Sequence, residues 1–196
     1  NGTMVQVAVT DLSAYFDDEI TAMPNLVTVG AANTLTTVAG IPFYQGDSGS
    51  IYTHNVSGTD STATDNTAFG INAMDAITTG DINTAVGKDA LGANTTGAQN
   101  VAIGRNSLIL NTTATANTGI GTSALSAVTT SGGNTAVGGD ALKANTAVGN
   151  TALGYQAGQA NTSGVRNLAI GYQAYTASDT ENDNLAIGYA AMITNT

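Results

Sequence analysis

The stretch that decides the fold is NTAVGKDAL, residues 83 to 91, because the chain repeats it at a fixed interval. It returns as NVAIGRNSL at 100, NTGIGTSAL at 117 and NTAVGGDAL at 134. Aligned on the Asn, eight copies begin at 66, 83, 100, 117, 134, 150, 167 and 184. The intervals are 17 residues, with a single interval of 16 between 134 and 150. A short fixed period predicts a solenoid in which each repeat is one coil stacked on the next.

Two positions of the repeat never change. Position one is always Asn, which includes Asn83, Asn100 and Asn117, and stacked Asn side chains can hydrogen-bond along a ladder. Position five is always Gly, which includes Gly87, Gly104 and Gly121. A Gly fixed at a corner predicts a positive φ or the close approach of another backbone.

Between the Asn and the Gly, the pattern predicts a short strand whose side chains alternate between two faces. Position four is apolar in every copy, so we expect it to point inward. Position two shares that face, and it changes from Thr84 through Val101 to Leu168, which indicates at least partial burial. Position three is Ala in seven copies and Gly119 in the other, which predicts tight packing there.

Positions eight and nine, for example Ala90 and Leu91, predict a second apolar strand in each coil. The spacers are rich in turn-forming residues, and an extra NTAVG at 145 to 149 is assigned to one of them. Two strands and two turns describe a narrow roll, about 35 Å long for seven steps of about 4.8 Å. Such a roll leaves positions three, eight and nine with too little cover, so we expect lateral packing against identical copies.

The pattern NTAVGxxAL, with its constant Asn and Gly, resembles the N-S-V-A-I-G repeat of the YadA-like heads of trimeric autotransporter adhesins. The 17-residue period and the NTA variant are more similar to repeats of bacteriophage tail fibres. The resemblance covers residues 66 to 196 and implies a left-handed parallel β-roll that assembles as a homotrimer. It implies no catalytic residue and no cofactor, and the adhesin stalk and membrane anchor have no counterpart in the sequence.

Residues 1 to 65 lack the repeat and are expected to form a small α+β connector before the β-roll domain of residues 66 to 196. Leu12, Tyr15, Phe16, Ile20 and Met23 share one face at helical spacing, which predicts a helix over 11–23. Short strands are expected in the rest of the connector. The opening without a Met, and the end just after a repeat, suggest a piece of a longer polypeptide.

Composition excludes several classes of function. The formal net charge is −10, with four scattered bases, which argues against nucleic acid and against an anionic membrane surface. There is no Cys, so neither a disulfide framework nor a thiolate metal site is expected. No apolar run approaches a membrane span. The single His54 has no catalytic motif around it, and phosphate-binding and serine-nucleophile motifs do not occur, so we do not expect an enzyme.

Two groups of residues are candidate binding sites. Position six is the most variable, which indicates that it points outward, and its last three copies are Tyr155, Tyr172 and Tyr189. With Gln156 and Gln173 beside them, these rings form a candidate receptor-facing strip for a glycan or a protein; stacking along the solenoid or trimer contact is the alternative. The acidic residues Asp179, Glu181 and Asp183 are spaced as Ca²⁺ ligands can be, but the pattern of known calcium loops is missing, so no metal site is predicted.

Three functions follow from these expectations. The first is a structural and adhesive shaft, a trimeric segment of a bacteriophage tail fibre that takes part in host attachment and lies outside the cell in the virion tail. The second is the head of a bacterial adhesin on the cell surface. The third is an ice-binding solenoid, which needs an outward ladder of Thr; the Thr ladder here is expected to be buried, which weighs against it. The sequence names neither the host nor the receptor.

Overall fold

The computed structural model describes residues 62–176 and 180–193, together with four short strands that precede them. The chain divides into two compact units, Asn1–Phe43 and Tyr44–Thr196. In the first unit, β1 (Thr37–Val38) pairs with β2 (Ile41–Pro42) in antiparallel orientation. The helix expected over 11–23 lies outside the described residues.

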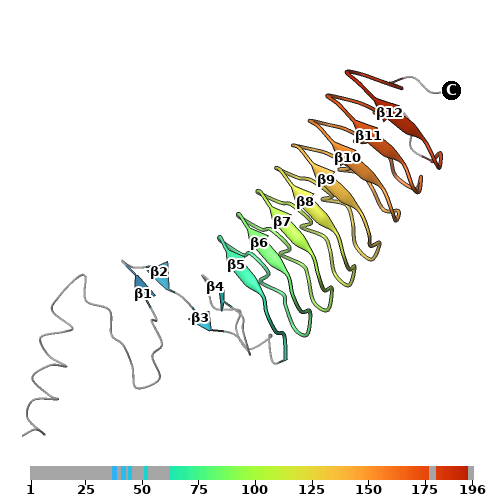
Figure 1. Cartoon of the computed structure of the whole chain (residues 1–196). Helices are drawn as coiled ribbons and strands as arrows, with labels where there is room; N and C mark the ends of the chain where they lie inside the picture. The colour runs from blue at the N-terminus through green and yellow to red at the C-terminus, as the bar shows by residue number, and fades with distance from the viewer. Residues whose placement is uncertain are drawn as a thin grey trace, which may run out of the picture. The chain divides into compact units, whose positions relative to one another are not determined.

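The second unit is a solenoid with one three-residue strand in each copy of the repeat (Figure 1). Its strands are β5 (Thr67–Phe69), β6 (Thr84–Val86), β7 (Val101–Ile103), β8 (Thr118–Ile120), β9 (Thr135–Val137), β10 (Thr151–Leu153), β11 (Leu168–Ile170) and β12 (Leu185–Ile187). Each is parallel to the next, with equivalent repeat positions opposite each other. Strands β3 (Tyr44–Gln45) and β4 (Ile51–Tyr52), from the expected connector, extend the same sheet. The predicted all-β parallel solenoid is therefore confirmed, while its handedness and trimeric state stay predictions.

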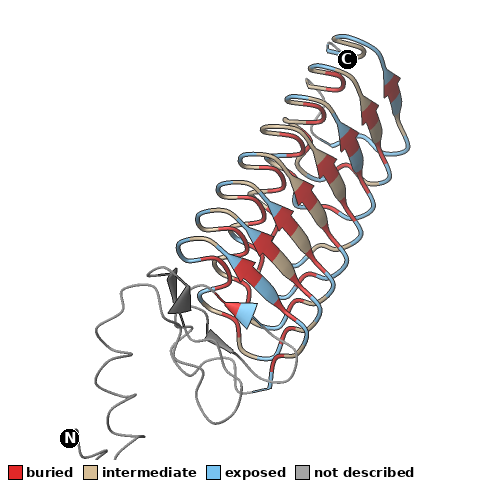
Figure 2. Cartoon of the chain, turned by 60° about the vertical axis from the view of Figure 1, so that its left-hand side comes forward, coloured by how far each residue is buried: buried red, intermediate tan, exposed pale blue. Residues whose placement is uncertain are grey.

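The prediction of which strand face points inward is wrong. In the strands of the repeat, β5 to β12, the middle residue at position three is buried, and positions two and four are exposed or half-buried (Figure 2). Positions three, eight and nine, which we expected to lack cover, form the core within a single chain, as Ala85, Ala90 and Leu91 illustrate. The coil is so flat that Ala on the strand side and Leu on the other side fill it, which leaves no room for the Ile or Val of position four.

The second strand of each coil is also absent from the described residues. Positions six to eleven form consecutive turns, in which positions seven and nine have positive φ, for example Asp89 at 58° and Leu91 at 50°. A β-strand requires negative φ at every residue, so this segment cannot be one. Its N–H groups alternate between local and intercoil partners: Ala90 N–H donates to Gly87 O, and Leu91 N–H donates to Ser107 O of the next coil.

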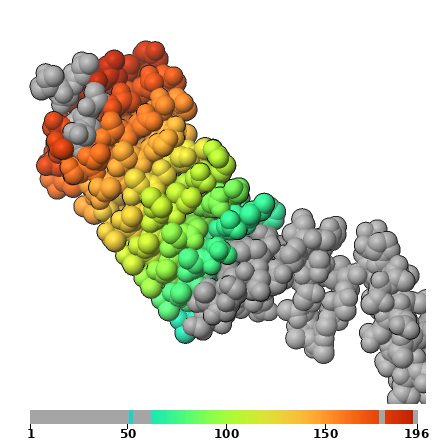
Figure 3. Space-filling view, turned by 180° about the vertical axis from the view of Figure 1, so that it is seen from behind, coloured from blue at the N-terminus to red at the C-terminus, as the bar shows by residue number. Residues whose placement is uncertain are grey.

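Stacking is continuous from coil to coil, as the successive coloured bands in Figure 3 show. Gly119 illustrates how tight the core is, because a Cβ at that position would lie 2.6 Å from the Ser107 hydroxyl oxygen. Ser107 stands where six of the other seven copies have a buried Ala, and its hydroxyl donates to Gly119 O at 2.9 Å. Gly119 lacks the methyl group that Ala has at this position in the other copies, and this leaves space for the hydroxyl group of Ser107.

The pentapeptide NTAVG occurs at 83–87, 134–138 and 145–149, and the structure uses it in two ways. The first two occurrences provide strands β6 and β9, whereas Thr146–Val148 lies in a turn, as the spacer assignment predicted. The third occurrence follows the second by 11 residues, which is too few to close a coil of 16 or 17. Position within the stack, and not local sequence, decides whether this segment becomes a strand.

Candidate functional site

The outward face of the parallel sheet is a candidate interaction site that runs along all eight strands of the repeat. It consists of two ladders, one from position two and one from position four of every strand. Position two contributes Thr67, Thr84, Val101, Thr118, Thr135, Thr151, Leu168 and Leu185, and position four contributes Phe69, Val86, Ile103, Ile120, Val137, Leu153, Ile170 and Ile187. No charged residue interrupts either ladder.

The two ladders form a flat face roughly 35 Å long and about 10 Å wide, if strands are spaced by about 4.8 Å. Ile103 is 39% exposed, and Ile187 at the last strand is 61% exposed. A contiguous exposed face of this size lies in the range of the largest patch on a typical monomer, about 300–600 Å², and such patches often mark interaction surfaces. Because the interior of each coil is already filled, the described coils provide no partner for this face.

The ladder of Asn side chains at position one keeps the coils in register. Asn100 N–H and Asn100 Nδ2 both donate to Asn83 Oδ1, at 3.0 and 3.1 Å, and Asn117 N–H donates to Asn100 Oδ1 at 3.0 Å. Asn100 Nδ2 also donates to Ala114 O at 2.8 Å. Asn83, Asn100 and Asn117 are fully buried, so their hydrogen bonds replace those that water would otherwise supply.

A second Asn ladder, at position twelve, was missed by the sequence analysis. Asn94, Asn111, Asn145 and Asn161 are fully buried, and Asn111 Nδ2 donates to Asn94 Oδ1 at 3.0 Å. Three of the four, Asn94, Asn111 and Asn161, also open an N-x-[ST] sequon. The recurrence of an Asn-Thr pair at position twelve of the repeat could have predicted this ladder. The Thr that follows also forms a ladder, since Thr95 Oγ1 donates to Thr112 O at 3.0 Å.

The second ladder is interrupted at Val128, which occupies the position-twelve site between Asn111 and Asn145. Asn111 Oδ1 is buried there without a hydrogen-bond donor. We expect Val128→Asn to supply that donor, because the new amide lies next to Asn111 in the stack. The substitution should leave the free energy of unfolding unchanged or raise it by up to about 1 kcal/mol.

The matched control is Leu125→Asn, which places the same amide in the same coil at a core site without a ladder partner. We expect it to cost about 3 kcal/mol, because it removes a buried apolar side chain and buries an unsatisfied polar group. Urea titration of both variants followed by circular dichroism measures the difference. Equal losses for the two variants would contradict a ladder that accepts Asn at position twelve.

The Gly ladder at position five combines a positive φ with close backbone contact. Gly104 has a φ of +130°, and a Cβ built on it would lie 2.6 Å from the carbonyl carbon and oxygen of Gly121. Gly87 and Gly121 have the same geometry, at φ values of +127° and +131°. Both physical reasons that the sequence offered for this Gly are therefore present at the same corner.

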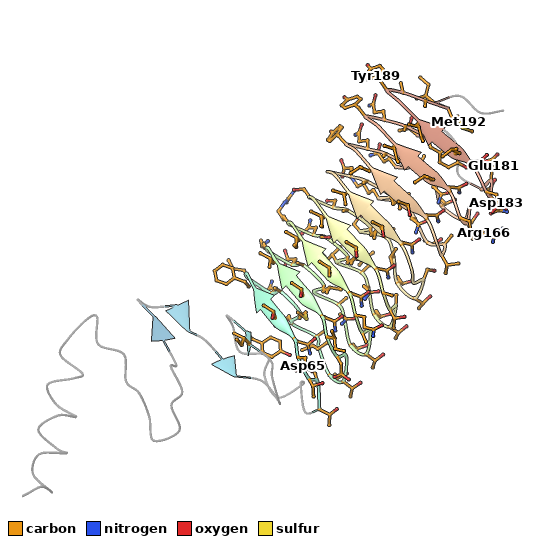
Figure 4. All side chains as sticks on the ribbon, in the orientation of Figure 1. Asp65, Arg166, Glu181, Asp183, Tyr189 and Met192 are labelled. Carbon is orange, nitrogen blue, oxygen red and sulfur yellow. The ribbon has the colours of Figure 1, made fainter. Side chains whose placement is uncertain are left out.

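The strip of Tyr155, Tyr172 and Tyr189 lies at one edge of the sheet, where Figure 4 labels Tyr189. The ring centroids are 5.5 and 5.6 Å apart with interplanar angles of 25° and 8°, so the rings stack on one another. Tyr155 and Tyr172 are 47% and 46% exposed, and Tyr189 is 80% exposed. Stacking covers the ring faces between neighbours, so the strip offers ring edges, hydroxyl groups and the outer face of Tyr189, which is the most exposed of the three.

The two Gln residues beside the strip continue the pattern of intercoil pairing, since Gln173 Nε2 donates to Gln156 Oε1 at 2.8 Å. At the opposite edge, the Arg166 guanidinium forms a bidentate pair with Asp183, at 2.6 and 2.8 Å. This hydrogen bonding and charge lower the pKa of Asp183 and raise the pKa of Arg166. Hydrogen bonds from Asn72 and then Lys88 likewise lower the pKa of Asp89.

The structure describes two of the three acidic residues near the last repeat, Glu181 and Asp183. Asp179 lies outside the described residues, Glu181 is exposed, and Asp183 is paired with Arg166. Within the described ranges, no cluster of three or more His, Cys, Asp or Glu side chains is placed to hold a metal ion. The same ranges contain no helix with the length and hydropathy of a membrane span. His54 lies among the residues whose placement is not described.

Comparisons with models of protein families, with curated protein sequences and with solved structures found no significant match. The class that the fold and the exposed face define is thus a parallel β-solenoid with an unpaired apolar sheet face. The similarity to YadA-like heads and tail-fibre repeats rests on the sequence pattern alone.

Proposed function

We propose that this chain is a segment of a trimeric fibre, with its sheet face turned toward a common axis, and that the fibre is the tail fibre of a bacteriophage. The observation that carries the proposal is the exposed apolar face that runs along every coil from β5 to β12. The occupant that fits such a face is a second and third copy of the same chain, because only an identical repeat matches its length and spacing. The head of a bacterial surface adhesin is the alternative, and genes for tail proteins or for a secretion signal and anchor beside this one would distinguish them.

The reason for assembly differs from the one that the sequence suggested. Positions three, eight and nine need no cover from other chains, because each coil buries them itself. Positions two and four do need it, and their alternation with a buried Ala places both on one flat surface. Three such surfaces facing each other form a second apolar core on the axis, outside the core of each coil.

Sedimentation equilibrium of the purified chain tests the proposal directly. We expect a single species with three times the 19.4 kDa chain mass. A stable monomer with the circular dichroism spectrum of a β-protein would contradict the fibre assignment.

Host attachment through the strip of Tyr155, Tyr172 and Tyr189 is the adhesive part of the proposal, with Gln156 and Gln173 as polar neighbours. The ligand would be a surface glycan or protein that contacts ring edges, hydroxyl groups and the open face of Tyr189, and contacts from three chains would add through avidity. Replacing all three Tyr by Ser should then weaken binding of the trimer to bacterial cells at least tenfold. Unchanged binding by a variant that sediments as the parent does would identify the strip as a structural stack.

A specific observation favours ice binding as a second candidate function. Five of the eight position-two residues are Thr, and they lie on the exposed face, contrary to the expectation that they are buried: Thr67, Thr84, Thr118, Thr135 and Thr151. The bulky Phe69 and Leu153 make the neighbouring ladder less regular. The two functions need the same face, so they exclude each other. A monomer that shows thermal hysteresis supports ice binding, and a trimer without hysteresis supports the fibre.

A further inference from the structure

Each strand of the repeat is bordered by two positions, one at either edge of the sheet, and their residues are exposed except for the half-buried Gly139. Position seventeen comes just before the Asn, and position six comes just after the Gly. Figure 4 labels Tyr189, from position six, at one edge, and Arg166 and Asp183, from position seventeen, at the other. From the first coil to the last, position seventeen is Asp65, Ile82, Gln99, Ala116, Gly133, Gly149, Arg166 and Asp183, and position six is Ile71, Lys88, Arg105, Thr122, Gly139, Tyr155, Tyr172 and Tyr189.

We infer that, in the assembled fibre, the position-six edge of each copy contacts the position-seventeen edge of the next copy. The inference rests on the proposed trimer. When three parallel copies turn their sheets toward one axis, rotation makes the strands of all three run the same way round it. The end of each strand then meets the beginning of the neighbour's strand, and the two residues that meet come from the same coil level.

The composition of the two edges fits this pairing level by level. Lys88 faces Ile82, and Arg105 faces Gln99, so neither cation meets another. If the position-six edges of two chains met each other instead, Lys88 would contact Lys88 and Arg105 would contact Arg105. Such contacts between like charges are unfavourable. Where position six is Gly139, position seventeen is also a Gly.

The aromatic levels are complementary as well. Tyr155 faces Gly149, which leaves space for its ring, and Tyr172 faces Arg166. The Arg166 guanidinium is already oriented by its bidentate pair with Asp183, and a planar guanidinium can stack on an aromatic ring while its N–H groups bind a carboxylate. The Tyr strip therefore borders the contact between two copies of the chain, with its hydroxyl groups and outer ring edges left open at the rim.

Engineered disulfides test this contact without interference, because the chain has no Cys. The test pair is Ala116→Cys with Thr122→Cys in one chain, two exposed positions that flank β8. We expect oxidation to yield a covalently closed trimer on a denaturing gel, which reduction converts to monomer. Each single variant should stay monomeric on that gel, because a residue at one edge does not contact the same residue of another chain.

A register control pairs Ala116→Cys with Lys88→Cys, two coil levels apart. The separation of about 10 Å exceeds the reach of a disulfide, so we expect no covalent product. A second test pair, Gln99→Cys with Arg105→Cys, one level below, guards against a local folding defect and should also yield the covalent trimer.

The outcomes separate the inference from the proposed function. A trimer by sedimentation whose two test pairs give no covalent trimer, or whose single variants form covalent dimers, would overturn the edge contact and leave the trimeric fibre intact. A covalent dimer as the final product would show a two-chain assembly and contradict both. A parent chain that sediments as a monomer would contradict the proposed function first, and the edge contact with it.

Discussion

Gly104→Ala should lower the thermal midpoint of the solenoid by roughly 10 °C, through a loss of about 3 kcal/mol or more in unfolding free energy. Two costs combine at this corner. The φ of +130° is a conformation that essentially only Gly adopts, and the new Cβ would lie 2.6 Å from the backbone of Gly121. Because the neighbouring atom belongs to backbone in the next coil, relief of the clash requires the two coils to move apart.

Gly133→Ala is the matched control, since it is the same substitution at another Gly with a positive φ. Gly133 has a φ of +72°, and no atom lies within 4 Å of the position that its Cβ would take. Its expected cost is the left-handed backbone strain alone, about 1 kcal/mol, or roughly 3 °C in the midpoint. Differential scanning calorimetry measures both. Similar losses at the two positions would mean that the backbone angle, and not the contact between coils, requires the Gly ladder.

The repeat made the coil and its two ladders at positions one and five predictable. The register between coils of a solenoid depends on residue types that recur at one position of the repeat. Asn at position one and Gly at position five, for example Asn83 and Gly87, are present in all eight copies. The same reasoning correctly placed residues 145 to 149 in a spacer, because 11 residues cannot span a coil. Each of these conclusions rests on spacing, which a single sequence displays completely.

The inward face could not be predicted from polarity. The apolar side chain of Ile103 indicates burial, but the pattern does not say whether its own coil or another chain provides that burial. Side-chain volume decides which face is buried, because only a small residue such as Ala102 fits between the strand and the turns of so flat a coil. The turns opposite the strand could not be predicted either. Leu108 has a φ of 51°, which a bulky residue rarely adopts, and the core around it holds it in that conformation.

Ile103→Asp should abolish the proposed trimer at neutral pH and leave the solenoid of each chain folded. Ile103 is 39% exposed in the single chain, so a carboxylate there stays in contact with water as long as the chain is a monomer. In the trimer, three such carboxylates would be buried near the axis without cationic partners. The desolvation penalty of several kcal/mol for each of the three ions, added to the repulsion among them, opposes the association of the whole trimer and not of one coil level alone. Sedimentation velocity should show a monomer at concentrations where the parent is a trimer.

Leu110→Asp provides the comparison. It replaces another exposed aliphatic side chain of the same coil by a carboxylate, but in the turns and not in the strand. Leu110 is 51% exposed and lies outside both ladders of the sheet face, so the variant should sediment as a trimer. Circular dichroism should give the parent's spectrum for both variants, which separates loss of assembly from loss of folding. If Ile103→Asp stayed a trimer, the chains would have to associate through another surface, and the sheet face would remain open to the solvent. If Leu110→Asp became a monomer instead, the turn side would be the surface that the copies share.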